Sequence, residues 1–247
     1  MTSARPQLCW LVLICLALAP SSYALDLKKL LEGVKIPETS QASGVAALSQ
    51  GEIGKGLKEA LSQGVQRAIK SLGKTDGYLG NPKVKIPIPD SLRSVESGLR
   101  AVGQNQYADQ FVTAMNRAAE RAVPEAASIF GSAISKMTLD DARKLLNGPD
   151  NAATDYFRRT STDDLIARFR PIVEQTTKSV GVTSAYKDLV GRAGFVGQLL
   201  GKDTTDIDGY VTNQAVGGLF TLIAAEEKRI RTQPIARTTE LLRKVFE

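Results

Sequence analysis

Glu226 is the polar residue whose predicted position most invites a chemical role. Apolar residues at helical spacing predict a helix over about residues 205–232, and Glu226 projects close to the middle of the apolar face of that helix. A carboxylate in the core is costly unless an arginine or several donors neutralise it, and Arg121 and Arg168 are the expected partners. Glu226 therefore predicts either a structural buried ion pair or a functional acid.

Asn116, Arg117 and Glu120 form a second group, on one helical turn that faces away from the apolar stripe of its helix. Arg117 and Glu120 are spaced i, i+3, which favours an exposed ion pair along the helix. The same two side chains could instead contact a ligand, so both are candidate binding residues.

Asp150, Tyr156 and Arg158 form a third group around the start of a predicted helix, with Arg159 beside them. The first backbone N–H groups of a helix attract anions, and nearby arginines would strengthen such a site. Asp150 follows the turn at residues 147–149 and competes for the same N–H groups. A turn and a helix cap are therefore the simpler interpretation.

Aspartates at residues 202–209 invite a calcium interpretation, but their spacing does not fit it. The segment lacks the alternating ligands and the distal bidentate glutamate of the helix–loop–helix calcium motif. Thr205 or Asp206 is expected to cap the long helix instead. Paired carboxylates could hydrolyse a glycan without histidine, with Glu120 or Glu226 as acid or base, but no spacing selects a pair among the 26 acidic residues.

Several kinds of chemistry lack their essential atoms. The sequence has no histidine, and both cysteines, Cys9 and Cys15, lie with the single tryptophan in the first 24 residues. A cysteine nucleophile, a Ser-His-Asp triad, a thiolate or imidazole zinc site and a haem held by His or Cys are therefore excluded for the rest of the chain. We expect no catalytic residue, no metal and no cofactor.

The elements that must position the candidate residues follow an export signal. Residues 8–19 are almost entirely apolar, Arg5 precedes them, and a small-residue pattern ends at Ala24. Twelve apolar residues are too few to span a bilayer, which takes about 20, so cleavage after Ala24 and a periplasmic location are predicted. We expect three parts: a signal peptide at 1–24, a short helix and linker at 25–47, and a single all-helical domain at 48–247.

One stretch of that domain is predicted to be extended. In residues 76–89, turn residues precede Val84, Ile86 and Ile88, which alternate with Lys85 and prolines. Prolines exclude a central strand and fix an extended geometry. We therefore expect a Pro-rich strap that its three apolar side chains pin to the helices.

The remaining pattern is helical. A capping box at Ser49 predicts one helix start, and the pattern from Thr138 to Asp141 predicts another. Ser161 is expected to begin a further helix in which Pro171 makes a kink. Helices are predicted at 49–72, at 90–103, at 107–134 with a break at Pro124, at 138–146, from 150, from 161, at 183–192, at 205–232 and at 235–246. The predicted fold class is all-α, an irregular multi-helix bundle with one Pro-rich extended strap.

The charge balance bears on partners. The sequence has 32 Lys plus Arg against 26 Asp plus Glu, a net charge of +6. This excess suits weak contact with an anionic membrane surface, but no basic stripe interleaved with aromatic residues indicates a nucleic-acid partner.

Several long motifs resemble those of one bacterial family, the exported helical proteins grouped as domain of unknown function 4197. They lie at residues 76–89, 137–142, 146–150, 152–158, 168–171, 226–227 and 237–242. The resemblance covers about residues 48–246 and implies an exported, all-helical domain. It implies no activity and no site residues.

These observations favour a non-enzymatic periplasmic domain that binds a small amphipathic or anionic ligand, such as a lipid, or an envelope partner. The expected site is a groove between the strap and the helices. Its candidate residues are Arg117, Glu120, Asp150, Tyr156, Arg158 and Glu226. The alternative is a carboxylate-dependent hydrolase of an envelope polymer.

Overall fold

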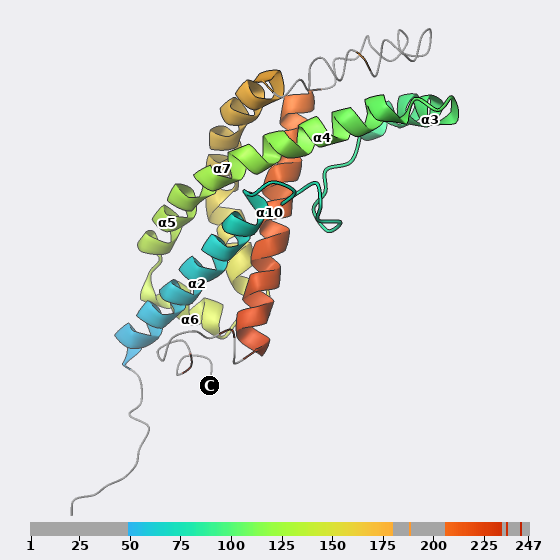
Figure 1. Cartoon of the computed structure of the whole chain (residues 1–247). Coiled ribbons are helices and arrows are strands. Elements are labelled where there is room, and N and C mark those ends of the chain that lie inside the picture. The colour runs from blue at the N-terminus through green and yellow to red at the C-terminus, as the bar shows by residue number, and fades with distance from the viewer. Residues whose placement is uncertain (1–48, 180–187, 189–205, 234–235, 237–242, 244–247) are drawn as a thin grey trace, which may run out of the picture. The chain divides into compact units, whose positions relative to one another are not determined.

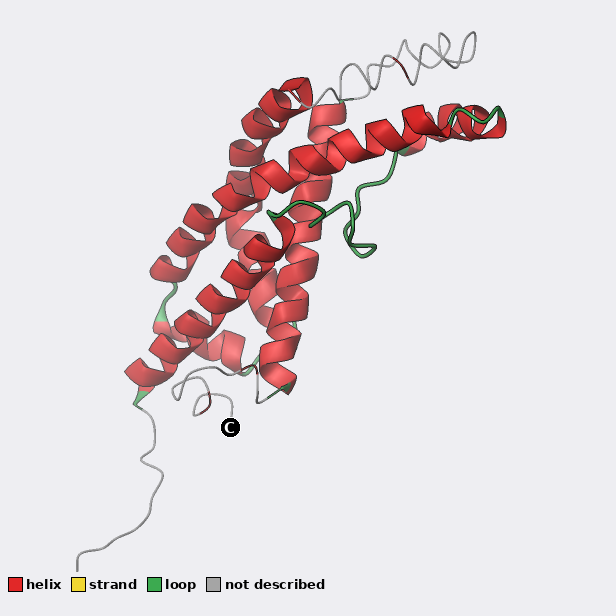
Figure 2. Ribbon diagram, viewed as in Figure 1, coloured by secondary structure: helices red, strands yellow, loops and turns green. Residues whose placement is uncertain are grey.

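The computed structural model describes residues 49–179, 188, 206–233, 236 and 243, and the structural statements below refer to these residues (Figure 1). They contain helices, turns and loops but no strand (Figure 2), which confirms the all-α class. The signal peptide and the short helix and linker at 25–47 lie outside the described residues, as do nearly all of the helices at 183–192 and 235–246.

The described elements follow the predicted order closely. The α-helices are α2 (Gln50–Leu72), α3 (Arg93–Ala101), α4 (Asn105–Ala122), α5 (Ala126–Lys136), α6 (Leu139–Leu146), α7 (Ala152–Ser179) and α10 (Ile207–Thr232), with 3-10 helices η1 (Asp90–Leu92) and η2 (Val123–Glu125). Pro124 lies in η2, so the predicted break between α4 and α5 is confirmed.

The predicted helix caps are confirmed where local chemistry sets them. The hydroxyl of Ser49 accepts from the N–H of Glu52 at 3.3 Å, while the Ser49 N–H donates to the Glu52 carboxylate at 2.8 Å. Thr138 and Asp141 form the same capping box at the start of α6, and these hydrogen bonds from Thr138 lower the pKa of the Asp141 carboxyl. Reciprocal bonds of this kind satisfy N–H groups that a helix start leaves free.

The helix start predicted at Ser161 is wrong, because α7 continues through it to Ser179, with Pro171 inside the helix. Buried side chains recur every four residues along α7, at Phe157, Ser161, Leu165, Phe169 and Val173. Ser161 therefore occupies a core-facing position within one long stripe. That stripe, packed against other helices, overrides the three-residue capping pattern.

Helix α10 is the central packing element of the described bundle. It packs against α7, α2 and α4 (Figure 1). Helix α3, by contrast, makes its main contacts only with α4 and η1. Phe130, Phe157 and Phe220 meet edge to face where α5, α7 and α10 converge, with ring centroids 5.1 and 6.2 Å apart. Such aromatic pairs add to the area that they bury.

The Pro-rich strap, residues 76–89, runs from the end of α2 to η1 in turns and extended chain. Val84, Ile86 and Ile88 are all buried, while Lys85 and Pro87 between them are exposed. The prediction that three apolar side chains pin the strap is confirmed.

Candidate functional site

Glu120 and Arg117 anchor the start of the strap. One Glu120 carboxylate oxygen accepts from the N–H groups of Tyr78 and Leu79 at 3.1 and 3.2 Å, and the other accepts from Arg117 at 2.6 Å. Arg117 also donates to Asp76 at 2.7 Å, and its bonds to Glu120, then to Asp76, raise the pKa of the guanidinium.

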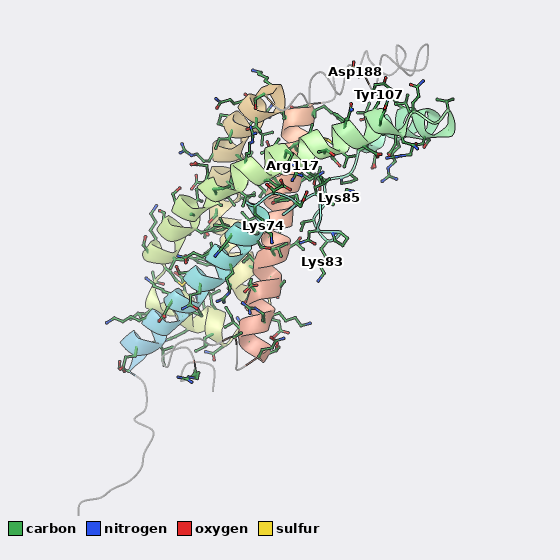
Figure 3. All side chains as sticks on the ribbon, in the orientation of Figure 1. Lys74, Lys83, Lys85, Tyr107, Arg117 and Asp188 are labelled. Atoms are coloured by element: carbon green, nitrogen blue, oxygen red, sulfur yellow. The ribbon has the colours of Figure 1, made fainter. Side chains whose placement is uncertain are left out.

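The ion pair between Arg117 and Glu120 is confirmed, but its predicted exposure is wrong. The Glu120 side chain is only 5% exposed and that of Arg117 is 28% exposed. The strap covers the face of α4 that points away from the helix's apolar stripe, so the polar side chains on that face are buried. Figure 3 labels Arg117 beside the strap.

Asn116 holds the middle of the strap. Its side-chain oxygen accepts from the Ile86 N–H at 2.9 Å, and its amide nitrogen donates to the Ile86 carbonyl at 2.9 Å. Both residues are fully buried. One side chain thus gives the strap the two hydrogen bonds that a neighbouring strand would otherwise supply.

Tyr78 and Tyr210 tie the strap to α10 from the other side. The Tyr78 hydroxyl donates to the Ala215 carbonyl at 2.6 Å, and the Tyr210 hydroxyl donates to the Pro87 carbonyl at 3.0 Å. Burial, and then the nearby charge of Glu120, raise the pKa of the Tyr78 phenol above its usual range. The Tyr78 ring lies so close to Gly218 that a Cβ there would approach a ring carbon to 2.7 Å.

The buried acid of α10 is Glu227, and the prediction for its neighbour Glu226 is wrong. The side chain of Glu226 is 20% exposed and that of Glu227 is 6% exposed. Glu226 does bind arginines, as expected, but they are Arg67 of α2 at 2.8 Å and Arg229 at 2.6 Å, not Arg121 or Arg168.

Glu227 occupies the helix start at which an anion site was considered. Its two oxygens accept from the N–H groups of Ala153 and Thr154 at 2.9 and 2.8 Å. Arg231 also bonds Glu227, and it donates at 2.7 Å to the Leu145 carbonyl near the end of α6. The carboxylate and the guanidinium therefore complement the ends of two helices, and the anion at this N-terminus is the protein's own.

The other candidates of that group lie around the same helix without forming a site. Asp150 is exposed in the turn, and it does not cap α7, because Glu227 takes the N–H groups. The Tyr156 ring is buried in the core, and burial raises the pKa of its phenol. Arg158 is exposed and stacks 4.6 Å above the ring of Phe220.

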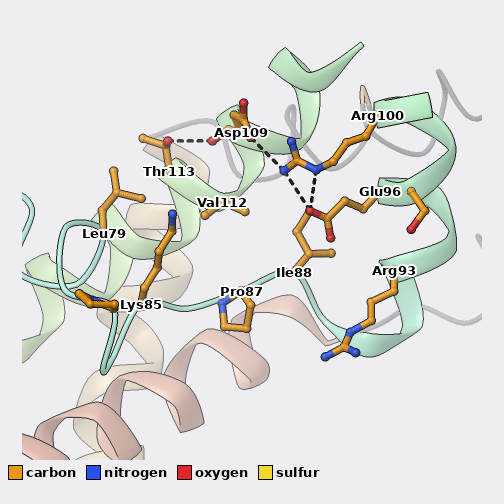
Figure 4. Close-up of a pocket in the computed structure, with 12 residues that line it drawn as sticks. Leu79, Lys85, Pro87, Ile88, Arg93, Glu96, Arg100, Asp109, Val112 and Thr113 are labelled. Atoms are coloured by element: carbon orange, nitrogen blue, oxygen red, sulfur yellow. Dashed lines mark hydrogen bonds and ion pairs between the residues drawn. The ribbon is translucent and has the colours of Figure 1, made fainter. Parts of the chain in front are cut away.

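A groove of about 660 Å³ lies between the strap, α3 and α4 (Figure 4). Its apolar lining comes from Leu79, Pro82, Pro87, Ile88 and Val112, and its polar lining from Lys85, Arg93, Glu96, Ser97, Arg100, Asp109 and Thr113. Its volume lies within the range of small-molecule sites, about 300–1,000 Å³.

The groove lining has more cationic than acidic side chains, and the cations differ in whether they have an acidic partner. Arg100 donates to both acidic lining residues, to Glu96 at 3.0 Å and to Asp109 at 3.0 Å, and these bonds raise the pKa of its guanidinium. Arg93 pairs with Asp90 outside the groove at 2.9 Å. Within the described part of the chain, Lys85 has no carboxylate partner, and Figure 4 shows its side chain rising from the strap toward α4.

The structure does not bring the six predicted site residues together. Arg117 and Glu120 meet beneath the strap, Asp150, Tyr156 and Arg158 surround the start of α7, and Glu226 lies against α2; none lines the groove. The predicted position of the groove is nevertheless matched by a cavity. Sequence reasoning missed Lys85 and Arg100 as lining residues, although the alternation of Lys85 with buried strap residues could have indicated the first.

The described residues offer neither a metal-binding cluster nor a membrane-spanning helix. They contain no cluster of three or more acidic side chains arranged to hold a metal ion. Among the described helices, none combines the length and the hydrophobicity that a membrane span requires. Asp206 caps α10, as predicted, by accepting from the Gly209 N–H at 2.8 Å, and the segment 202–205 before it lies outside the described residues.

The fold and the groove define an all-helical domain in which one extended strap is fixed across a helix by buried polar side chains. The model of the family described as "Protein of unknown function (DUF4197)" matches residues 47–247. The chain therefore belongs to that family, as its motifs indicated. Neither a curated protein nor a solved structure matches it.

Proposed function

We propose that this protein is an exported binding domain whose groove takes a small amphipathic anion. The observation that carries the proposal is the position of Lys85, a cation that lines a partly apolar cavity and has no ion-pair partner among the described residues. An apolar chain would lie against Ile88, Pro87 and Val112, while its anionic group would meet the ammonium. Desolvated apolar contact provides affinity, and a charge-assisted hydrogen bond provides orientation.

Export supports an amphiphile as ligand but is itself part of the proposal. The apolar run and the small-residue pattern that ends at Ala24 indicate a signal peptide. A protein sent to the envelope meets lipids and their breakdown products. The weak contact with an anionic membrane surface suggested by the net charge remains a prediction of the same kind.

No observation in the described structure favours the alternative, a carboxylate-dependent hydrolase. Both oxygens of Glu120 accept hydrogen bonds beneath the strap, and Glu226 is held by two arginines. Within the groove, Glu96 and Asp109 both bind Arg100. No pair of free carboxylates in the described residues faces the cavity, as acid/base hydrolysis would require.

Titration with sodium dodecanoate tests the proposal, with Lys85→Glu as the variant and Lys83→Glu as its control. Lys83 also lies exposed on the strap and has no ion pair in the described structure, but it does not line the groove (Figure 3). Both variants change the net charge equally. We expect Lys85→Glu to weaken binding at least about tenfold, and Lys83→Glu less than about twofold. Absence of binding, or equal effects of the two variants, would refute the proposal.

A further inference from the structure

The backbone of Ile88 has hydrogen-bonding groups without partners at the edge of the groove. Buried and exposed residues alternate along residues 84–88, so the chain there is close to two-fold. The N–H and C=O of Ile88 therefore point to the same side as those of Ile86, toward α4. The Pro87 carbonyl between them points the other way, to Tyr210 of α10, as this alternation requires.

Helix α4 satisfies Ile86 but not Ile88. Asn116 binds both backbone groups of Ile86, whereas the residues of α4 that line the groove one turn earlier are Val112 and Thr113. The Thr113 hydroxyl already donates to the Asp109 carbonyl at 2.7 Å. In the described structure, neither the N–H nor the C=O of Ile88 takes part in a hydrogen bond.

Ile88 is nevertheless only 3% exposed. Buried backbone groups are paired in the great majority of cases, so an unpaired donor and acceptor on the lining of a cavity are open to a partner from outside the chain, either water or a ligand that displaces it. Asn116 shows what fits the strap at this edge: an amide, which supplies one acceptor and one donor to a single residue.

We infer that the ligand of the groove is a short acylated peptide. Its first residue would pair with Ile88 through its own N–H and C=O, as one strand residue pairs with another. Its acyl chain would lie on the apolar lining, and its terminal carboxylate would reach Lys85, three residues back along the strap. This inference rests on the proposed function and adds the peptide unit to it.

Two probes that differ only in their N–H groups test the inference. N-dodecanoyl-glycylglycine has two amide N–H groups, whereas N-dodecanoyl-sarcosylsarcosine has the same acyl chain and carboxylate with both nitrogens methylated. We expect the glycyl compound to bind the wild-type protein about five- to tenfold more tightly, because methylation leaves the Ile88 carbonyl without a donor. In an NMR titration of the labelled protein, the Ile88 N–H resonance should move further downfield with the glycyl compound than with dodecanoate, whose chain contacts Ile88 without a peptide carbonyl to accept from the N–H.

A protein variant tests the other half of the pairing. Ile88→Pro removes the N–H in a segment that already holds an extended proline geometry, and Ile88→Val keeps it. Because Ile88 also lines the groove, the affinities for both compounds should change, but Ile88→Pro relative to Ile88→Val should weaken N-dodecanoyl-glycylglycine about tenfold more than it weakens dodecanoate. If Ile88→Pro does not fold, the comparison of the two probes on the wild-type protein still tests the pairing of a peptide with Ile88.

The outcomes separate this inference from the proposed function. Equal affinities for the two probes and equal shifts of the Ile88 resonance with the glycyl compound and with dodecanoate, while dodecanoate binding still depends on Lys85, would overturn the peptide pairing and leave the binding site intact. Absence of binding by all three compounds would overturn both.

Discussion

The two halves of the strap differ in how their polar groups are satisfied. From Asp76 to Ile86, the strap receives a buried carboxylate, an arginine and an amide from α4, and every one of these groups has partners. From Pro87 onward, its one hydrogen bond from a side chain of the described residues comes from Tyr210. Packing is tight in both halves, since Ile86 and Ile88 are both buried. The first half is therefore held by side chains of α4, whereas the second keeps the hydrogen-bonding capacity on which our proposal of a peptide ligand rests.

Among the substitutions that test this difference between the two halves, the largest loss of stability is expected at Glu120. Glu120→Leu leaves two backbone N–H groups of the strap unpaired and removes the buried partner of Arg117. We expect the free energy of unfolding to fall by about 3–4 kcal/mol in urea denaturation. The control is Glu125→Leu, which breaks an exposed pair with Arg168 and should cost less than about 1 kcal/mol. Similar losses in both variants would show that the first half is not the stabilising one.

Asn116 should give the next largest effect. Asn116→Leu keeps the apolar packing but leaves the Ile86 N–H and C=O buried without partners. The loss should be about 2–3 kcal/mol. Asn213→Leu, at an exposed position of α10, should change stability by less than about 0.5 kcal/mol. If Asn116→Leu were as harmless as its control, water would already reach this part of the strap.

The sequence predicted the elements whose causes are local and missed contacts that packing creates. The caps at Ser49, Thr138 and Asp206 were predictable, because each needs only residues within one turn. The burial of Glu120 was not, because it depends on a strap that starts about 40 residues earlier in the chain and crosses α4 only after folding.

Glu226 and Glu227 show why the angular position of a residue around a helix did not suffice to predict which carboxylate is buried. Helix α10 packs against three other helices, so no single face is the interior one. Glu226 points toward Arg67 of α2, while Glu227, one residue later, meets the start of α7. A stripe of apolar residues predicts a buried side reliably only when the helix has one such side. The position of the groove was predicted correctly, because the prolines and the alternation of apolar residues with Lys85 and prolines located the strap. The charged residues that line the groove were not predicted, because their positions depend on side-chain geometry that no sequence motif encodes.

A smaller, pH-dependent effect concerns the end of α10 that carries Tyr210. The hydrogen bond from the Gly209 N–H lowers the pKa of Asp206, the cap one turn before Tyr210. A carboxyl with a lowered folded pKa stabilises the fold above its ordinary pKa of about 3.9, and this stabilisation is lost as the pH falls through the folded value. Asp206→Ala should therefore cost about 1 kcal/mol at pH 7 and progressively less in acid. Asp206→Asn, which keeps a capping oxygen, should show only a small loss at pH 7; a pH-independent loss in Asp206→Ala would contradict the mechanism.

The smallest effect sharpens the comparison at Lys85, a residue of the first half that takes no part in its bonds to α4. Lys85 has no ion pair in the described structure and is exposed, so Lys85→Ala removes no contact that holds the fold. We expect its unfolding free energy to stay within about 0.5 kcal/mol of wild type. Arg117→Ala, which breaks bonds to Glu120 and Asp76 in the first half, should cost several times more in the same urea series. A loss from Lys85→Ala that matched Arg117→Ala would mean that Lys85 serves the fold, and the strap would then offer the groove no cation that is free to bind a ligand.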